Sequence, residues 1–234
     1  EKLMNAKFAT TCTKFNQTYL EQQIGCKVEL VYHGLELATV TTNARTCADD
    51  GLPLILAVGQ LKEKKGFAYL LQACQLLKAW GYQFHCEIIG EGPERKALER
   101  LCIDLNLTPE VTLRGALPQT EVMQRYRQAT IFTLPSVVAS NADRDGIPNV
   151  LLEAMANRLP VVSTRVSGIP EIVHDQATGL LVEANNAEAL AQALAQLLDN
   201  AELRARLAAA GRGFVETHFD IRKNIGRLTA LLDV

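Results

Sequence analysis

Two carboxylates, Asp145 and Glu153, stand eight residues apart around the start of a predicted helix. Between them, Gly146 lets the backbone approach a ligand closely, and Pro148 suits a first helical turn because its missing N–H would have no partner there. Such a helix start carries free N–H groups and a partial positive charge, which attract phosphate. A diphosphate there, with a carboxylate on each side to accept hydrogen bonds from hydroxyls, would suit a sugar nucleotide. On spacing alone, a plain surface helix is favoured, with Asp143 and Asp145 as turn residues and Glu153 solvated.

The composition indicates a globular protein of one large or two small domains. The 234 residues are 48% hydrophobic and 21% charged, and 24 basic against 26 acidic residues give a net charge of −2. No basic block or interleaved aromatic pattern predicts a nucleic-acid partner. No run of 18 apolar residues predicts a membrane span, and no apolar core of a signal peptide follows Glu1–Met4. We therefore expect a cytoplasmic protein, with the inner face of the membrane as an alternative location. The abrupt start without an initiator Met suggests a fragment.

The six cysteines carry no metal-binding signature, since none forms a CxxC pair. We expect reduced and mostly buried thiols in a cytosolic protein, and no metal. The cysteines are Cys12, Cys26, Cys47, Cys74, Cys86 and Cys102.

Hydrophobic periodicity predicts apolar strands that alternate with helices, which is typical of a parallel sheet covered on both faces. The fold class is therefore α/β, Rossmann-like, with a helical C-terminal tail. Residues 35–52 show no lasting pattern and are interpreted as a linker with a domain boundary near Gly51. Strands are expected at residues 8–12, 28–32, 54–58, 84–89, 111–113, 130–134, 160–164 and 179–182. Helices are expected at 13–24, 66–80, 94–105, 120–128, 169–174, 187–199, 201–217 and 221–232, together with the helix that contains Glu153.

Four loops rich in glycine or proline follow strands of this predicted sheet: residues 59–66, 90–93, 114–118 and 135–148. In open α/β sheets, ligands bind at the carboxyl ends of the strands. The four loops should therefore converge on one crevice, where a phosphate-bearing small molecule is the leading ligand class. This inference rests on the expected fold alone, and proteins with many different chemistries share that fold.

Five segments, in a fixed order from about Leu52 to about His218, resemble the C-terminal, donor-binding half of a GT-B fold glycosyltransferase of family 4, whose members are retaining enzymes. They are Leu56–Gly59 with Lys64–Phe67, Ile88–Pro93, Val111–Gly115, Asp145–Glu153, and Gly168–Glu171 with Thr178–Val182. The stretch Asp143–Asn149 is most similar to bacterial exopolysaccharide transferases of the colanic acid type.

The resemblance implies a division of the chain. Residues 1–34 would be a remnant of the N-terminal acceptor domain, and residues 35–51 a linker. Residues 52–218 would be the Rossmann-like donor-binding domain, and residues 219–234 a C-terminal helix.

The resemblance also implies roles for single residues. Glu153 would hold the ribose of the nucleotide, and Asp145 stands where a glutamate usually lies near the sugar hydroxyls. Lys65 would neutralise the leaving diphosphate, whereas Lys62 and Lys64 are interpreted as solvated. Lys65 and Asp145 are thus the predicted catalytic residues. The predicted donor-binding residues are Gly59, Gln60, Lys65, Gly90, Gly92, Arg114, Gly115, Asp145, Gly146, Ile147, Asn149, Val150 and Glu153.

Two residues depart from the family pattern. Gln60 stands where an arginine usually contacts phosphate, so Lys65 carries that role alone or turnover is weakened. Asp145 is one methylene shorter than the usual glutamate, which allows a different sugar pose or preference. Gly168 and Glu171 match the pattern and are expected only to turn the chain. The four histidines, His33, His85, His174 and His218, are all interpreted as structural.

The function implied is transfer of a sugar from a nucleotide-diphosphate sugar to a hydroxyl of a glycan or lipid-linked acceptor, with retention and without metal or cofactor. This chain would be the donor-binding half, inactive alone. An alternative is a non-catalytic nucleotide-sugar binding module, for which Gln60 and Asp145 would be signs of repurposing. A glycoside hydrolase with Asp145 and Glu153 as its carboxylate pair is the least favoured, because Glu153 lies two turns inside an apolar-striped helix.

Overall fold

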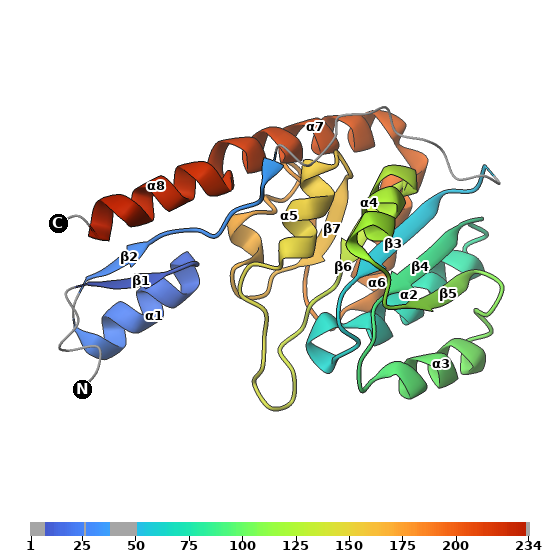
Figure 1. Cartoon of the computed structure of the whole chain (residues 1–234). Helices are drawn as coiled ribbons and strands as arrows, with labels where there is room; N and C mark the ends of the chain where they lie inside the picture. The colour runs from blue at the N-terminus through green and yellow to red at the C-terminus, as the bar shows by residue number, and fades with distance from the viewer. Residues whose placement is uncertain (1–7, 26, 38–50, 233–234) are drawn as a thin grey trace.

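The computed structural model describes residues 8–25, 27–37 and 51–232. Its centre is a six-stranded sheet with the order β5-β4-β3-β6-β7-β8, in which every pairing is parallel (Figure 1). The strands are β3 (Leu54–Val58), β4 (His85–Ile89), β5 (Val111–Gly115), β6 (Ile131–Leu134), β7 (Val161–Thr164) and β8 (Leu180–Val182). All residues of β3, β6 and β7 are buried, as expected for inner strands of a parallel sheet.

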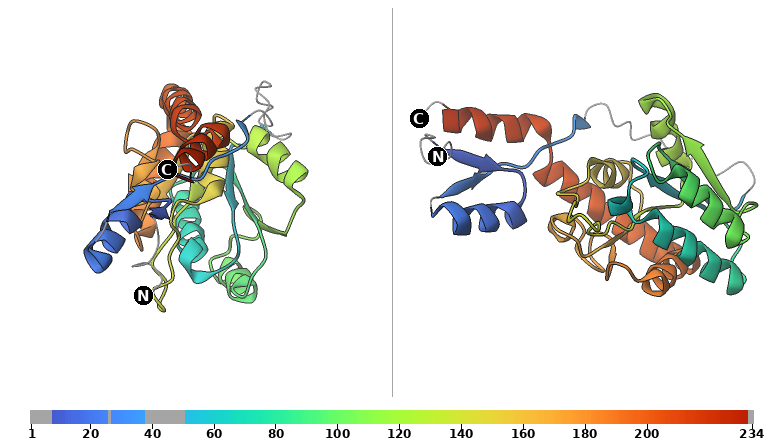
Figure 2. Two further views of the ribbon diagram at one scale, coloured as in Figure 1. Left: turned by 60° about the vertical axis from the view of Figure 1, so that its left-hand side comes forward. Right: turned by 90° about the horizontal axis from the view of Figure 1, so that it is seen from below.

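Helices cover both faces of this sheet, which confirms the predicted α/β class (Figures 1 and 2). On one face lie α2 (Phe67–Ala79), α3 (Arg95–Asp104) and α6 (Ala187–Asp199), and on the other lie α4 (Gln119–Gln128) and α5 (Asn149–Ala156). The long helix α7 (Ala201–His218) packs against α5 and α6. Most helices begin and end within two residues of their predicted bounds.

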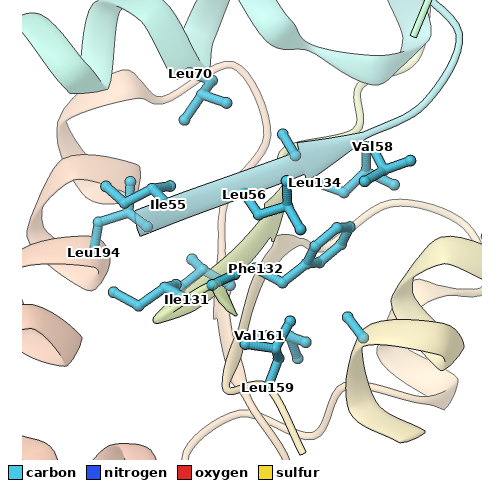
Figure 3. Close-up of a cluster of buried hydrophobic side chains, with 14 of the residues drawn as sticks. Ile55, Leu56, Val58, Leu70, Ile131, Phe132, Leu134, Leu159, Val161 and Leu194 are labelled. Atoms are coloured by element: carbon cyan, nitrogen blue, oxygen red, sulfur yellow. The ribbon is translucent and has the colours of Figure 1, made fainter. Parts of the chain in front are cut away.

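The core lies between the sheet and these helices (Figure 3). Ile55 pairs with Ile131 and Leu56 pairs with Phe132 across β3 and β6, so each pair shares one face of the sheet. Leu70 of α2 lies over the face that carries Ile55. All of these side chains are fully buried, and each contributes about 1.5–3 kcal/mol relative to an exposed position.

The strand order places the crevice of the sheet between β3 and β6. From β3 the chain builds outward through β4 and β5, and then returns to the other side of β3 to build β6, β7 and β8. Loops that follow neighbouring strands on both sides of this switch point open a crevice at the carboxyl edge. The four predicted loops all follow strands of this sheet, so they lie at that edge as expected.

The two ends of the described chain lie side by side (Figures 1 and 2). A parallel two-stranded sheet of β1 (Ala9–Thr11) and β2 (Val28–Leu30) carries α1 (Lys14–Ile24) on one side and the C-terminal α8 (Ile221–Leu232) on the other. Leu35 N donates to Phe219 O at 2.8 Å, and Ile221 N donates to Leu35 O at 3.1 Å. The predicted domain division stays a prediction, and residues 38–50 of the predicted linker lie outside the described residues.

One predicted helix is shorter than expected. Instead of a helix over residues 169–174, the chain forms a single 3₁₀ turn, η3 (Ile169–Glu171). The hydroxyl of Thr178 accepts a hydrogen bond from His174 N at 2.8 Å and donates to Ile172 O at 3.1 Å. These backbone groups are therefore satisfied by a side chain, and the helix ends early.

The described cysteines are free thiols: Cys74, Cys86 and Cys102 are buried and Cys12 is exposed. Cys26 and Cys47 lie outside the described residues. Burial contributes to raising the pKa of the Cys102 thiol, with the nearby Cys86 and Glu110 adding to it. Within the described ranges, no helix is long and apolar enough to cross a membrane, and no cluster of three or more His, Cys, Asp or Glu could hold a metal ion.

Candidate functional site

The predicted catalytic residues Lys65 and Asp145 form an ion pair at the switch point of the sheet. Lys65 Nζ lies 2.8 Å from Asp145 Oδ2, and only 13% of the lysine and 11% of the aspartate side chain is exposed. Lys65 ends the 3₁₀ helix η2 (Glu63–Lys65), and Gly66 follows it with a φ of 65°. A Cβ on Gly66 would lie 1.9 Å from Pro135 O, so glycine allows the β3 loop to press against the chain that leaves β6. That close approach brings the pair together.

Three consecutive residues of η2 each hold one residue of the β6–α5 loop (residues 135–148). Glu63 accepts hydrogen bonds from both the amide and the hydroxyl of Ser140, each at 2.9 Å. Lys64 Nζ lies 3.1 Å from Asp143 Oδ1, and Lys65 pairs with Asp145. We call these three contacts the loop clasp. The clasp fixes the loop that carries Asp145.

Lys64 is not the solvated lysine that was predicted, because its Nζ also lies 3.5 Å from Asp145 Oδ1. Partial burial works to lower the pKa of Lys64, but the hydrogen bond to Asp143 and the charge of Asp145 outweigh it and the pKa is raised. Two lysines therefore face one carboxylate in the crevice. Lys62, by contrast, is exposed as expected.

Ser136 is a further hydrogen-bond partner of Asp145. It is fully buried, and its Oγ lies 3.3 Å from Asp145 Oδ2. Its own carbonyl accepts a hydrogen bond from Thr164 Oγ1 at 2.5 Å. Asp145 thus has a hydroxyl partner that is anchored to β7, in addition to the lysines.

The first turn of α5 lies directly after this loop. Pro148 is the N-cap in extended conformation, so the helix starts at Asn149, one residue later than the proline. The amides of Asn149 and Val150 are first-turn N–H groups, which have no partner within a helix. Ile147, which precedes Pro148, is buried. A Cβ on Gly168 would lie 2.9 Å from Ile147 Cγ1 and 3.0 Å from Gly146 O, so Gly168 does more than turn the chain: it lets η3 pack against the approach to α5.

Glu153 is the fifth residue of α5, in its second turn rather than two turns inside the helix, and it is half-buried rather than solvated. The hydroxyl of Tyr126 on α4 donates to Glu153 Oε2 at 3.0 Å. Tyr126 is fully buried, and burial raises the pKa of its phenol well above the usual value, with the charge of Glu153 adding to the rise. The phenol therefore remains a hydrogen-bond donor over the whole physiological pH range.

The glycines predicted in the neighbouring loops let the backbones of these loops pack closely against one another. Gly90 has a φ of 147°, and a Cβ there would lie 1.9 Å from Gly59 O. A Cβ on Gly92 would lie 2.4 Å from Leu61 O, and Gly115 has a φ of 79°. Gly59, Gly90, Gly92 and Gly115 thus line adjacent positions at the carboxyl edge of β3, β4 and β5. Gln60 is exposed beside them.

The structure does not bring the guanidinium of Arg114 to the Lys65–Asp145 pair. Arg114 Nη2 lies 2.6 Å from Glu87 Oε1 in the middle of β4, and Arg125 of α4 lies 3.5 Å from the other oxygen of the same carboxylate. Arg114 is 40% exposed and Glu87 is 9% exposed. The side chain of Arg114, a predicted donor-binding residue, is therefore paired with Glu87 instead of reaching this site.

The N-terminal segment reaches the same crevice through Glu171. The Glu171 carboxylate accepts hydrogen bonds from Lys14 N at 2.8 Å, Phe15 N at 3.0 Å and Tyr32 Oη at 2.9 Å. The first two donors are the N-terminal amides of α1, which favour a negative charge. Arg144 lies over the ring of Phe15, with its Cζ 5.1 Å from the ring centroid. Glu171 therefore joins η3 to α1, a role that goes beyond turning the chain.

His33 also lies near the start of α5. Burial lowers the pKa of this imidazole, and an interaction with the Asn149 side chain works in the opposite direction. The backbone carbonyl of His33 accepts a hydrogen bond from Asn224 Nδ2 at 3.2 Å, and its ring lies edge-on to Phe219. His33 is thus a packing residue, as predicted, and through Asn149 it also contacts the helix that is predicted to bind phosphate.

The chain matches the model of a family described as glycosyl transferases group 1 over residues 42–214. It belongs to this family. Two similar relatives are "Amylovoran biosynthesis glycosyltransferase AmsK" from Erwinia amylovora, 36% identical over 213 residues, and "Putative colanic acid biosynthesis glycosyltransferase WcaL" from Escherichia coli, 38% identical over 217 residues. Each match covers 90% of this chain, but 52% and 53% of the relative. The chain thus spans about half the length of these relatives.

Solved structures show that this member of the glycosyl transferases group 1 family has the fold of GT-B glycosyltransferases. Sucrose-phosphate synthase from Thermosynechococcus elongatus superposes with a TM-score of 0.84 at 24% identity, over 98% of this chain and 59% of that chain. Anabaena Alr3699/HepE, crystallised in complex with UDP and glucose, superposes with a TM-score of 0.83 at 18% identity, over 97% of this chain and 63% of that chain. At these identities the likeness concerns the fold.

Sequence reasoning missed three partners in this group 1 member: Ser136, Tyr126 and Lys64. Ser136 follows Pro135 at the end of a buried strand, a position that places a polar side chain at the crevice. Tyr126 is one of two buried residues of α4 and resembles any core aromatic at helical spacing. No pattern in the sequence separates Lys64 from Lys62, because their difference arises from the fold of the β6–α5 loop.

Proposed function

We propose that this chain is the donor-binding half of a retaining glycosyltransferase. The whole protein transfers a sugar from a nucleotide-diphosphate sugar to a hydroxyl of a glycan or lipid-linked acceptor. The observation that carries the proposal is the Lys65–Asp145 pair beside the first turn of α5, with Glu153 in the second turn of the same helix. A cation, a carboxylate and free helix amides lie together at the switch point, where α/β folds bind nucleotides.

Each residue has a role in this proposal. The amides of Asn149 and Val150 bind the diphosphate, and Lys65 stabilises the negative charge that develops on it as it leaves. Asp145 accepts hydrogen bonds from hydroxyls of the donor sugar, and Glu153 accepts them from the ribose. The glycines of the first three loops let these loops pack closely together at the carboxyl edge, where the nucleotide binds.

The reaction proceeds on one face of the sugar. The bond between the anomeric carbon and the diphosphate oxygen breaks, the acceptor hydroxyl oxygen forms a bond to the same face, and its proton passes to the departing diphosphate. No metal or cofactor is part of this proposal. Donor binding replaces the Lys65–Asp145 ion pair. Lys65 then pairs with the diphosphate, and Asp145 accepts a hydrogen bond from a sugar hydroxyl.

The names of the relatives suggest the class of acceptor. The two relatives described above carry amylovoran biosynthesis and colanic acid biosynthesis in their names. The proposed acceptor is therefore a growing exopolysaccharide or its lipid-linked precursor. The acceptor would bind mainly through the half that this chain does not contain, with residues 1–34 as its remnant. The chain alone is therefore proposed to be inactive in transfer, and the protein to act in the cytoplasm or at the inner face of the membrane.

Thermal shift tests the proposal directly, since a ligand that binds the native state raises the melting temperature by mass action. The chain is melted with UDP-, GDP- and ADP-sugars and with the matching nucleoside monophosphates. We expect one nucleotide-diphosphate sugar to raise the midpoint in the wild type and less in a Glu153→Ala variant. A matched control is Glu183→Ala, which removes an exposed carboxylate that pairs with Arg165 and not with Lys65 or Tyr126. No shift with any sugar nucleotide would contradict donor binding.

A second candidate is a non-catalytic nucleotide-sugar binding module, which the uncharged and exposed Gln60 favours. Both candidates predict binding, so they differ only in turnover. The chain joined to an N-terminal half of a relative would release free nucleoside diphosphate from a sugar nucleotide if it is an enzyme. Tight donor binding without any release would favour the binding module.

A further inference from the structure

We propose that Tyr126 is a positioning residue for the ribose-binding carboxylate. This inference rests on the proposed function, in which Glu153 contacts the ribose. The hydroxyl of Tyr126 donates to Glu153 Oε2 at 3.0 Å from a different helix, α4. The contact joins the two helices that cover the same face of the sheet, next to the crevice.

The phenol ring is held rigidly. Tyr126 has no exposed surface, and its ring packs against Phe132 of β6 with the ring centroids 5.6 Å apart. A side chain packed on all sides keeps a single rotamer. Its hydroxyl therefore has a fixed place beside α5.

The direction of the hydrogen bond is settled by chemistry. A carboxylate only accepts hydrogen bonds, so the phenol must donate to Glu153. The carbonyl of Val150 lies 3.4 Å from the same hydroxyl, which is at the outer limit of a hydrogen bond, and so Glu153 is the better acceptor. Burial keeps the phenol protonated, and Tyr126 is thus a permanent donor.

The arrangement leaves one carboxylate oxygen of Glu153 for a ligand. Oε2 is held by Tyr126, and the described residues give Glu153 no other side-chain partner. A glutamate side chain on a helix has several rotamers, and fixing one in advance reduces the entropy lost on binding. The tyrosine thereby prepares Oε1 to accept a hydrogen bond from a ribose hydroxyl.

Tyr126→Phe removes the hydroxyl and keeps the ring. The affinity for UDP or GDP, whichever the wild-type chain binds more tightly, is measured by calorimetry together with that for inorganic diphosphate. We expect about fivefold weaker binding of the nucleoside diphosphate, the effect of one hydrogen bond, and unchanged binding of inorganic diphosphate. The preference for this nucleotide over its 2′,3′-dideoxy analogue should shrink by the same factor. If the role of Tyr126 were purely structural, Tyr126→Phe would weaken the binding of both ligands equally, or of neither.

The matched control is Tyr82→Phe. Tyr82 also donates to a carboxylate, Asp199 Oδ2 at 2.6 Å, but this partly buried residue follows the C-terminal end of α2, whereas the loop that carries Lys65 precedes α2. This variant should bind both ligands as the wild type does. Should the Tyr126→Phe chain not fold, Phe132→Leu keeps the hydroxyl but loosens the ring, and it should also weaken the nucleoside diphosphate selectively.

The result for Glu153→Ala separates the two proposals. If Glu153→Ala weakens nucleoside diphosphate binding and Tyr126→Phe does not, the positioning role is wrong and the ribose assignment stands. If Glu153→Ala leaves the affinity unchanged, the ribose assignment itself is wrong, and the role of Tyr126 falls with it. If both weaken binding and the double variant is no worse than Glu153→Ala alone, the two residues act as one unit.

Discussion

Lys65 Nζ lies 2.8 Å from Asp145 Oδ2, although 80 residues separate the two in sequence. The pair connects the loop after β3 with the loop after β6, which are the two sides of the topological switch point. Because both side chains are nearly enclosed, this contact is screened less than an exposed ion pair. Lys64 faces the same carboxylate at 3.5 Å, so the crevice carries two positive charges around one Asp145.

The loop clasp should control the mobility of the loop that carries Asp145. Glu63→Ala removes the acceptor of both hydrogen bonds from Ser140, so we expect faster amide hydrogen exchange over residues 138–144. The free energy of unfolding should fall by no more than about 1 kcal/mol, because these hydrogen bonds are exposed. Lys62→Ala is the control, since Lys62 is an exposed neighbour outside the clasp. Equal exchange in the two variants would contradict the clasp.

Glu171 should tie the N-terminal segment to the rest of the chain. Glu171→Ala leaves the amides of Lys14 and Phe15 and the hydroxyl of Tyr32 without their acceptor. By analogy with the loss of a helix N-cap, the free energy of unfolding should fall by about 0.5–2 kcal/mol. Hydrogen exchange of α1 should accelerate more than that of α2. The Glu183→Ala variant should show neither change, and unaltered exchange in α1 of Glu171→Ala would exclude the tie.

His33 should make the stability of the chain depend on pH below neutrality. Its folded pKa is lowered from 6.5 by burial, so the unfolded chain binds the proton more readily. The stabilisation from neutral His33 is therefore complete above pH 6.5 and is lost as the pH falls through the lower folded pKa. In His33→Asn, the loss of stability between pH 7.5 and 5.5, measured by urea denaturation, should be smaller than in the wild type. An equal loss in both proteins would show that His33 does not titrate in this way.

Two glycines should respond to alanine in opposite directions. Gly66→Ala places a Cβ 1.9 Å from Pro135 O at a φ of 65°, so we expect loss of more than about 2 kcal/mol or failure to fold. Gly213 lies inside α7 with nothing within 4 Å of its Cβ position, so Gly213→Ala should stabilise the chain by up to about 1 kcal/mol. Thermal melts of both variants measure the difference. A neutral Gly66→Ala would contradict the close packing of η2 against the β6 loop.

The fold could be predicted from the sequence because its inner strands are continuous apolar runs. Leu54–Val58 and Ile131–Leu134 are buried on both faces, and such runs between helical patterns indicate a parallel sheet. The positions of Asp145 and Glu153 on either side of the start of α5 also followed from the spacing. Apart from the segment that forms η3, the expected helix bounds lie within one residue of the observed ones, which is within the usual precision of such bounds.

The contacts of the site could not be predicted in the same way. The pairing of Lys64 with Asp143, and of Glu63 with Ser140, depends on the conformation of an irregular loop, which no periodicity describes. The shortening of the helix at η3 arises from one side chain, Thr178, that satisfies backbone groups locally. Glu171 acts on residues 156 and 157 positions away in sequence. Such long-range partners follow only from the fold.

The most direct test is a calorimetric titration of a nucleoside diphosphate into the wild-type, Lys65→Ala and Asp145→Asn chains. The account predicts that Lys65→Ala weakens binding by about 10- to 100-fold, the effect of a hydrogen bond to a charged group. Asp145→Asn should bind the nucleoside diphosphate at least as tightly as the wild type, because it removes the carboxylate that competes for Lys65, while its affinity for the sugar nucleotide falls relative to the nucleoside diphosphate. Unchanged affinity in Lys65→Ala would contradict the central claim that this lysine and the first turn of α5 bind the diphosphate.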